Sequence, residues 1–413
     1  MNSGFVSVIV AGITPFIILT LLIAGVSLHT VAWQPPALWT EVLGKGAHNV
    51  VVVADNNGVY AGGVAGADLF LSRYDMGGQR LWNQYFGNST TDSIYGVALG
   101  TDGVYVAGTL FNMDFITKYD PSGNALWAKT FGGLYYPTLS AGAGDVFVSF
   151  YDEASNSTLL RAYDSNGNTL WTDSLEYGSI IHMSTHSRDS RVYVIGYKGG
   201  NSLGSFDFQG NLNWGKNLTC SCEPVDLAAD ASGIYVAGTT YLDGLTASGV
   251  LIKYDVTGNM IWTRIYDAPG GIGVQNPQIS IDTTGIYLAM ATYRSSTSGL
   301  LVRYDDNGNQ IWSIEIPVSA DAVSIGQNSV YVGGTSSSAE LLAKYDQSSS
   351  LVLFGVNPPF SFGLVGLLAG VVALSVLWFR RQRRRQIRRP KSAVPYSSPK
   401  TGEDDSKWMK RQP

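Results

Sequence analysis

Short apolar runs separated by Gly, Asn and Asp fill the chain between two long apolar stretches near its ends. Runs of four to eight residues bounded by turn-forming residues are typical of β-strands. In one period, residues 96–99, 104–109, 115–119 and 125–130 show this pattern and predict four strands. Four strands in a repeat of about 45 residues is the arrangement of a β-propeller blade.

This period recurs seven times along the chain. An aromatic residue near the start of the second strand recurs at Tyr60, Tyr105, Phe147, Tyr193, Tyr235, Tyr287 and Tyr331. An Asp preceded by an aromatic residue recurs at Asp75, Asp120, Asp164, Asp207, Asp255, Asp305 and Asp346. A Trp lies seven residues after this Asp in six copies, at Trp82, Trp127, Trp171, Trp214, Trp262 and Trp312. We predict an all-β chain with a seven-bladed β-propeller of four-stranded blades over residues 33–357, in which these Trp side chains pack between blades.

The start of the repeat region holds one strand too many. Residues 37–44, Ala-Leu-Trp-Thr-Glu-Val-Leu-Gly, match the last strand of a blade, as in residues 125–132, yet they precede the first full copy. The seventh copy lacks a matching last strand. We therefore predict that the strand of Trp39 completes the seventh blade and closes the ring, which leaves no open sheet edge between the first and last blades.

The two long apolar stretches predict membrane segments. Residues 5–26 form a nearly unbroken apolar run, and residues 360–379 form an uncharged run of 20 residues. Each is about 30 Å long or more as a helix, enough to cross a bilayer. We expect residues 1–32 to be a membrane anchor or a signal peptide, and residues 358–379 to be a transmembrane helix. A Gly-x-x-x-Gly spacing at Gly366 and Gly370 is compatible with a weak homodimer through that helix.

Charge is distributed very unevenly. The net charge of −5 includes a tail, residues 380–413, with twelve Lys/Arg and three Asp/Glu, which leaves 15 basic and 29 acidic residues for the rest. Basic residues beside an apolar span stay on the cytoplasmic side. This predicts a basic cytoplasmic tail and a propeller outside the cell, held at the cytoplasmic membrane. The acidic body excludes nucleic-acid binding, which needs positive charge.

The repeat motif resembles that of a known family. Residues 233–238 read Gly-Ile-Tyr-Val-Ala-Gly, and residues 253–262 read Lys-Tyr-Asp-Val-Thr-Gly-Asn-Met-Ile-Trp. This pattern, found through all seven copies, resembles the SBBP seven-bladed β-propeller repeat family. It is also similar to quinoprotein-type, PQQ-like propellers, although those usually place the Trp eight residues after the Asp and have eight blades, adjacent cysteines and a calcium site. The resemblance implies a surface or exported propeller without an assigned activity.

Few residues point to chemistry. The repeated Asp residues are expected to cap turns, and His182 and His186 would be about 13 Å apart on a strand, too far to share a metal ion. Cys220 and Cys222 allow a local disulfide, two free thiols or a soft-metal site. Sequons at Asn88, Asn156 and Asn217 predict glycosylation sites. No catalytic, cofactor-binding or metal-binding residue is predicted.

These features together predict a membrane-anchored, extracytoplasmic propeller that acts as a non-catalytic binding or envelope-interaction module, without a cofactor. We expect its partner to be an envelope protein or a glycan. The repeats diverge most in residues 88–93, 217–223 and 268–276, so these loops are expected to form the contact surface. The alternatives are a propeller enzyme of quinoprotein-like or glycan-cleaving type, and a scaffold that works through the tail.

Overall fold

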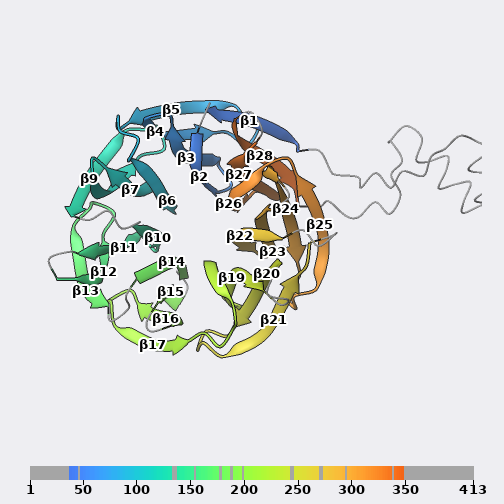
Figure 1. Ribbon diagram of the computed structural model, residues 1–413. Helices are drawn as coiled ribbons and strands as arrows, with labels where there is room; N and C mark the ends of the chain where they lie inside the picture. Colours follow the sequence, from blue (N-terminus) through green and yellow to red (C-terminus); the bar gives the residue numbers. More distant parts are fainter. Residues whose placement is uncertain are drawn as a thin grey trace, which may run out of the picture. The chain divides into compact units, whose positions relative to one another are not determined.

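The computed structural model describes residues 37–347, except 45–46, 133–136, 153–154, 176–178, 187–188, 198–199, 242–245, 269–272, 294 and 337–338. In this part of the chain, 28 strands form seven four-stranded sheets arranged in a ring (Figure 1). The predicted seven-bladed propeller is confirmed. The apolar stretches at 5–26 and 360–379 lie outside the described residues. Within those residues, no helix has the length and apolar character needed to cross a membrane.

The strands follow one another around the ring, four to a blade. Blades 1 and 2 contain β2 (Ala47–Ala54), β3 (Val59–Ala65), β4 (Asp68–Tyr74), β5 (Arg80–Phe86), β6 (Ser93–Gly100), β7 (Gly103–Leu110), β8 (Met113–Tyr119) and β9 (Ala125–Gly132). Blades 3 and 4 contain β10 (Thr138–Gly142), β11 (Asp145–Asp152), β12 (Ser157–Tyr163), β13 (Thr169–Leu175), β14 (Ser179–His186), β15 (Arg191–Tyr197), β16 (Asn201–Asp207) and β17 (Leu212–Asn217). Blades 5 and 6 contain β18 (Glu223–Asp230), β19 (Gly233–Tyr241), β20 (Ala247–Tyr254), β21 (Met260–Tyr266), β22 (Val274–Asp282), β23 (Gly285–Thr292), β24 (Ser295–Tyr304) and β25 (Gln310–Ile316). Blade 7 contains β26 (Ser319–Gly326), β27 (Ser329–Thr335), β28 (Glu340–Asp346) and β1 (Trp39–Gly44).

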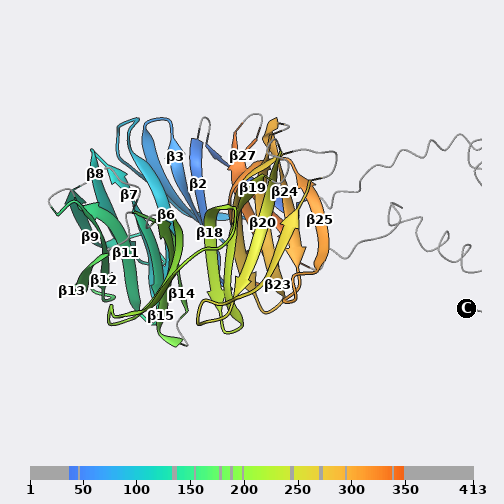
Figure 2. The same cartoon turned by 60° about the horizontal axis from the view of Figure 1, so that its bottom comes forward.

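Each blade is an antiparallel sheet whose first strand lies nearest the ring centre and whose fourth lies at the rim (Figure 1). Connections therefore gather on two opposite faces (Figure 2). One face carries the hairpins between second and third strands and the links from one blade to the next, and we call it the loop face. The turn face carries the tight turns between first and second strands and between third and fourth strands.

The ring closes through a strand from the start of the chain. β1 pairs antiparallel with β28, with Trp39 opposite Lys344, and the strand order in blade 7 is β1-β28-β27-β26. The inner strands β2 and β26 lie in contact across the junction. This confirms the predicted closure. It also supplies β28 with the hydrogen-bonding partner that its edge would otherwise lack.

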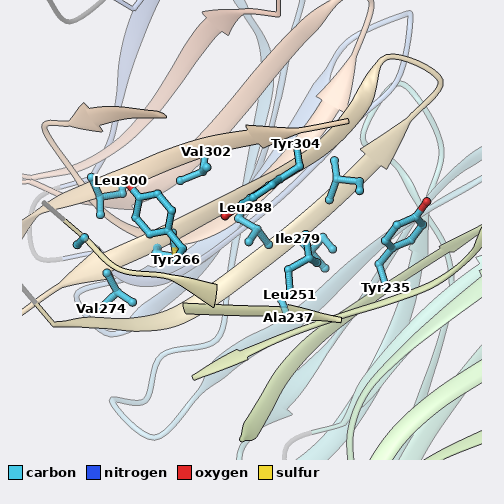
Figure 3. Packing of buried hydrophobic residues seen from close by; sticks show 13 residues of the cluster. Tyr235, Ala237, Leu251, Tyr266, Val274, Ile279, Leu288, Leu300, Val302 and Tyr304 are labelled. Carbon is cyan, nitrogen blue, oxygen red and sulfur yellow. The ribbon is translucent and has the colours of Figure 1, made fainter. Parts of the chain in front are cut away.

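The core consists of apolar layers between neighbouring blades. In one such layer, Tyr235, Ala237 and Leu251 of blade 5 pack against side chains of blade 6 that include Leu288 and Val302 (Figure 3). Middle strands such as β7 and β23 are buried over nearly their whole length because both faces meet another blade. This explains why the second strand of each repeat reads as a continuous apolar run rather than as an alternating pattern.

Among the described residues, each inner strand except β10 has an irregularity in its pairing register near the loop face. The pairing register shifts between Ile180 and His182 in β14, between Pro224 and Asp226 in β18, and between Ala320 and Ala322 in β26. A bulge adds a residue to one strand and redirects its side chains. These bulges place polar side chains of the inner strands at the loop-face end of the ring centre.

Candidate functional site

The repeated Asp residues build the turns of the turn face. Asp120 Oδ1 accepts hydrogen bonds from the backbone N–H groups of Ser122 and Asn124, and its Oδ2 accepts one from the Asn124 side chain. These hydrogen bonds hold the pKa of Asp120 below its ordinary value, and the bond from the Asn124 side chain has the largest effect. The same arrangement recurs at Asp164, Asp207, Asp255 and Asp305. These carboxylates are committed to turn geometry.

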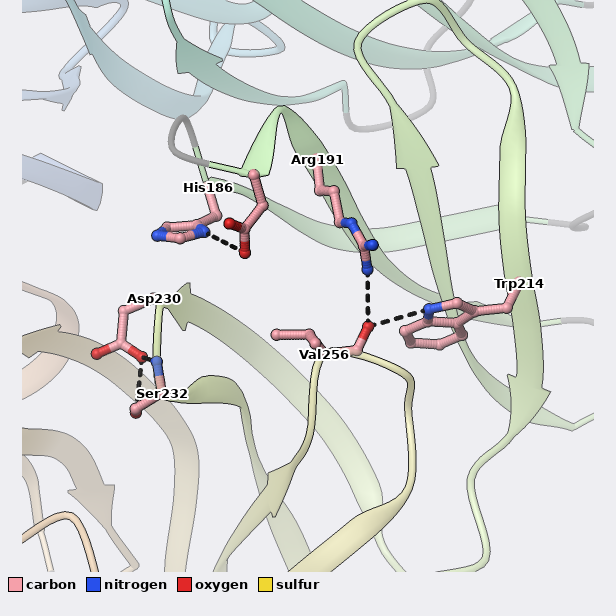
Figure 4. A network of polar contacts seen from close by, with 7 residues as sticks. His186, Arg191, Trp214, Asp230, Ser232 and Val256 are labelled. Carbon is pink, nitrogen blue, oxygen red and sulfur yellow. Dashed lines mark hydrogen bonds and ion pairs between the residues drawn. The ribbon is translucent and has the colours of Figure 1, made fainter.

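At five positions, the repeated Trp forms a hydrogen bond that links its blade to the next. The indole N–H donates to the carbonyl oxygen of the residue that follows the repeated Asp of the next blade, over 2.7–3.3 Å. The donor and acceptor pairs are Trp39 with Met76, Trp82 with Pro121, Trp127 with Ser165, Trp171 with Phe208, and Trp214 with Val256. A cation reinforces several of these links, as where Arg191 also donates to the Val256 carbonyl (Figure 4).

The glycine of each turn makes room for this indole. Gly123 has a φ of +89°, and a Cβ atom there would lie 2.9 Å from the Trp82 ring. Gly167 stands in the same relation to Trp127. The Asp, Gly and Trp of the repeat motif are therefore three parts of one inter-blade contact, which accounts for their presence in nearly every blade.

The loop face carries an arc of aromatic side chains. Each of the five consecutive blades 2–6 has one at the loop-face end of its second strand or directly after it; these are Phe111, Tyr151, Tyr197, Tyr241 and Tyr293. Four of the five have 47–58% of their surface exposed, and Tyr151 is partly exposed. In blades 1 and 7 the described residues at this end of the second strand are not aromatic. We call these five residues the aromatic arc.

A loop closed by a disulfide supports the middle of the arc. Cys220 and Cys222 form a disulfide with a Cα–Cα distance of 5.1 Å, in the loop that follows β17. The Thr240 hydroxyl, beside Tyr241, donates to the Ser221 carbonyl oxygen over 2.7 Å. The Asn201 side chain donates to the Cys222 carbonyl oxygen over 2.7 Å. The disulfide loop is thus tied to the hairpins of blades 4 and 5.

The third divergent loop contacts the arc directly. The backbone N–H of Tyr293 donates to the Gly273 carbonyl oxygen over 2.8 Å. Tyr241 and Tyr293 come from adjacent blades, and a hydrogen bond with Tyr293 raises the pKa of the Tyr241 phenol. Residues 217–223 and the described ends of the third divergent loop, residue 268 and residues 273–276, therefore lie on one face, next to these aromatic side chains.

The first divergent loop is held by a buried carboxylate. Asp92 is 2% exposed, and its Oδ2 accepts hydrogen bonds from the backbone N–H groups of Asn88 and Ser89. Its Oδ1 accepts one from the backbone N–H of Phe111 over 2.8 Å. One side chain therefore fixes both the loop that enters blade 2 and the hairpin that carries the first residue of the arc.

Polar groups also meet at the ring centre, on the inner strands. His182 Nδ1 lies 2.7 Å from Asp226 Oδ1, and Asp226 Oδ2 accepts the backbone N–H of Ile279. Asp226 thus joins blades 4, 5 and 6. Burial opposes protonation of His182, but the charge of Asp226 and its hydrogen bond raise the pKa of the imidazole above its ordinary value. His186 instead contacts Asp189 at 3.1 Å (Figure 4), so the two histidines have different partners.

A second titratable group lies at the junction of blades 7 and 1. Asp321 occupies the bulge of β26, and its carboxylate accepts a backbone hydrogen bond from Val50 of β2. Burial, and then the neighbouring Glu340 carboxylate, raise the pKa of Asp321 to about 7. The side chain therefore changes charge near neutral pH at the point where the ring closes.

The three sequon asparagines also lie on the loop face. Asn88 follows β5, Asn156 lies in the hairpin of blade 3, and Asn217 ends β17. All three are exposed. The Asn156 side chain accepts a hydrogen bond from the Tyr151 hydroxyl. Among the described residues, no group of three or more His, Cys, Asp or Glu side chains is arranged to hold a metal ion.

Comparisons with known proteins agree with the fold. No protein-family model matches the chain, and no curated protein matches it. Raptor from Chaetomium thermophilum is similar over 77% of this chain and 29% of its own length, with 8% identity and a TM-score of 0.57. The β-propeller domain of Cps50 (Swd1) from Myceliophteria thermophila is similar over 75% of this chain and 99% of its own length, with 11% identity and a TM-score of 0.55.

BamB from Moraxella catarrhalis also matches, over 76% of this chain and 98% of its own length, with 15% identity and a TM-score of 0.49. At identities this low, the two matches with the higher TM-scores show a shared fold alone. The SBBP resemblance stays a prediction. From its own strand pairing and from these matches, the chain is a seven-bladed β-propeller of four-stranded blades.

Proposed function

We propose that this propeller is a protein-binding module that engages its partner through the loop face. The aromatic arc is the observation that supports this most. Tyrosine and other aromatic residues supply large contact areas at low entropic cost and dominate binding energy at protein interfaces. Around the arc, the loops are rich in Ser, Thr, Asn and Gly, as in residues 87–92, Gly-Asn-Ser-Thr-Thr-Asp. This composition provides adaptable hydrogen bonds around rigid aromatic contacts.

The turn face is less suited to that role because its repeated residues serve the blades themselves. Its repeated Asp, Gly and Trp residues are occupied by turns and inter-blade links, as described above. Residues that diverge between blades are free to acquire specificity, and rigid blades position them. All three divergent loops belong to the loop face.

We further propose that the module is anchored in the cytoplasmic membrane by residues 360–379, with the propeller outside the cell. The start of β1 and the end of β28 both lie on the turn face, where Leu38 N–H donates to the Lys344 carbonyl oxygen. Chain segments that lead to an anchor would therefore leave from the turn face.

Matched variants of the full-length chain test the loop face. Tyr241→Ser combined with Tyr293→Ser removes two arc residues, while Leu81→Ser combined with Leu126→Ser removes two residues of similar exposure from outer strands. Proteins cross-linked in native membranes are then quantified by mass spectrometry. We expect partner recovery to fall about tenfold or more for the tyrosine variant and to stay near wild type for the leucine variant. Equal recovery for both variants would contradict the proposal.

A further inference from the structure

The hairpin of blade 2 presents an aromatic ring in an unusual way. Phe111 is 58% exposed, and Met113, two residues later, is 42% exposed. Phe111 and Asn112 have φ values of +52° and +61°, both in the left-handed region. Such a turn favours Asn-Gly, and a bulky residue at positive φ is a genuine outlier. In blade 1, Gly66 with φ +71° lies at the corresponding hairpin.

The surroundings hold this strained residue in place. The buried Asp92 carboxylate accepts the Phe111 N–H and also fixes the preceding loop. Gly87 leaves the space that this carboxylate needs, since a Cβ atom there would lie 2.7 Å from Asp92 Oδ2. The Thr91 hydroxyl contacts the Asn112 side-chain oxygen at 3.5 Å. A rigid support under an exposed side chain on a strained backbone is a form of preorganisation, and backbone strain of this kind is concentrated at functional sites.

We propose, on the basis of the proposed function, that Phe111 is the apolar anchor of the loop face and inserts into an apolar pocket of the protein partner. Phe111 lies exposed in the hairpin between β7 and β8, so the partner supplies the concave surface. The Phe111 and Met113 side chains offer no strong hydrogen-bonding group, so the pocket is apolar. Asn88, Ser89 and Thr91 form a polar rim beside it, as is usual around binding hot spots.

A photocrosslinking amino acid tests this assignment in the full-length chain. p-Benzoyl-phenylalanine is placed at position 111, at Tyr241, or at Leu81 as an exposed control on an outer strand. We expect position 111 to give a discrete protein adduct that is absent at position 81. The partner is identified from its adduct by mass spectrometry and produced separately without the cross-link, and its affinity for the full-length wild type and for Phe111→Gly is measured.

Phe111→Gly separates binding from folding. Glycine adopts positive φ without strain, so the variant is expected to melt at the same temperature as wild type or higher, yet to bind about thirtyfold more weakly. An unchanged affinity would overturn the anchor. So would an adduct to lipid or to a glycan on Asn88 in place of a protein. An adduct at position 241 without one at 111 would overturn the anchor while leaving the loop-face proposal standing, and no protein adduct at either position would contradict both.

Discussion

At the scale of single residues, most repeated positions are explained by local geometry. Turn chemistry predicted that the repeated Asp caps a turn, because such a cap depends on neighbours a few residues away. In the structure these Asp residues cap their turns, and the Gly of each of these turns has a positive φ. The contact between His182 and Asp226 was not predicted, since it depends on which inner strands become neighbours and where each one bulges.

The close approach of Gly123 to the Trp82 indole can be tested by substitution. Gly123→Ala is expected to lower the free energy of unfolding by about 2 kcal/mol, because the new methyl group meets the Trp82 ring and φ is positive. Gly132→Ala is the matched control, since a Cβ atom there has no neighbour within 4 Å. Urea unfolding compares the two variants. Equal stabilities would show that the glycine is not needed for inter-blade contact.

The carboxyl group of Asp321 predicts a pH dependence. Its folded-state pKa of about 7 lies above the unfolded value of about 3.9, so its contribution to stability is fully present below pH 4 and is lost as pH rises through 7. Asp321→Asn removes this pH-dependent loss of stability, because an amide side chain does not ionise. We expect the variant to match wild type near pH 4 and to be more stable by about 2 kcal/mol near pH 8, after allowance for partial solvent screening. A stability difference that does not change with pH in chemical denaturation would contradict the assignment.

At the scale of elements, the Trp links define how one blade holds the next. Trp127→Phe keeps an aromatic ring and removes the hydrogen bond to the Ser165 carbonyl oxygen, so we expect a loss of about 1 kcal/mol. Trp312 provides an internal control, because its buried indole N–H has no acceptor among the described residues. Trp312→Phe should therefore cost less than Trp127→Phe in thermal or chemical unfolding. The reverse order would show that packing, rather than the hydrogen bond, sets the role of these residues.

At the scale of elements, the repeat pattern did not reveal that the residues of the aromatic arc are exposed on one face. Phe111, Tyr241 and Tyr293 each lie six residues after the repeated aromatic of their second strand, so an alignment of the repeats contains the signal. Their exposure does not follow from that alignment. It depends on hairpin lengths and on bracing by loops of the neighbouring blades, which the structure supplies.

At the scale of the whole molecule, ring closure was predictable because the extra strand at residues 37–44 carries the blade motif itself. Deletion of residues 37–44 from the full-length chain removes the partner of β28 and the Trp39 link to Met76. We expect a loss of several kcal/mol in unfolding free energy, about the sum of a lost strand pairing and a buried aromatic contact. Deletion of residues 1–36 serves as the control and should leave the unfolding of the propeller unchanged. Unchanged unfolding after the first deletion would contradict closure through β1.

The central claim is that the loop face binds a protein partner, and cryo-electron microscopy of the full-length chain tests it most directly. The chain is purified with its bound proteins from native membranes, and the propeller orients each particle. We predict additional protein density over the loop face of blades 2–6, in contact with the aromatic arc. Density confined to the turn face, or a small molecule bound at the ring centre without a protein partner, would contradict the account.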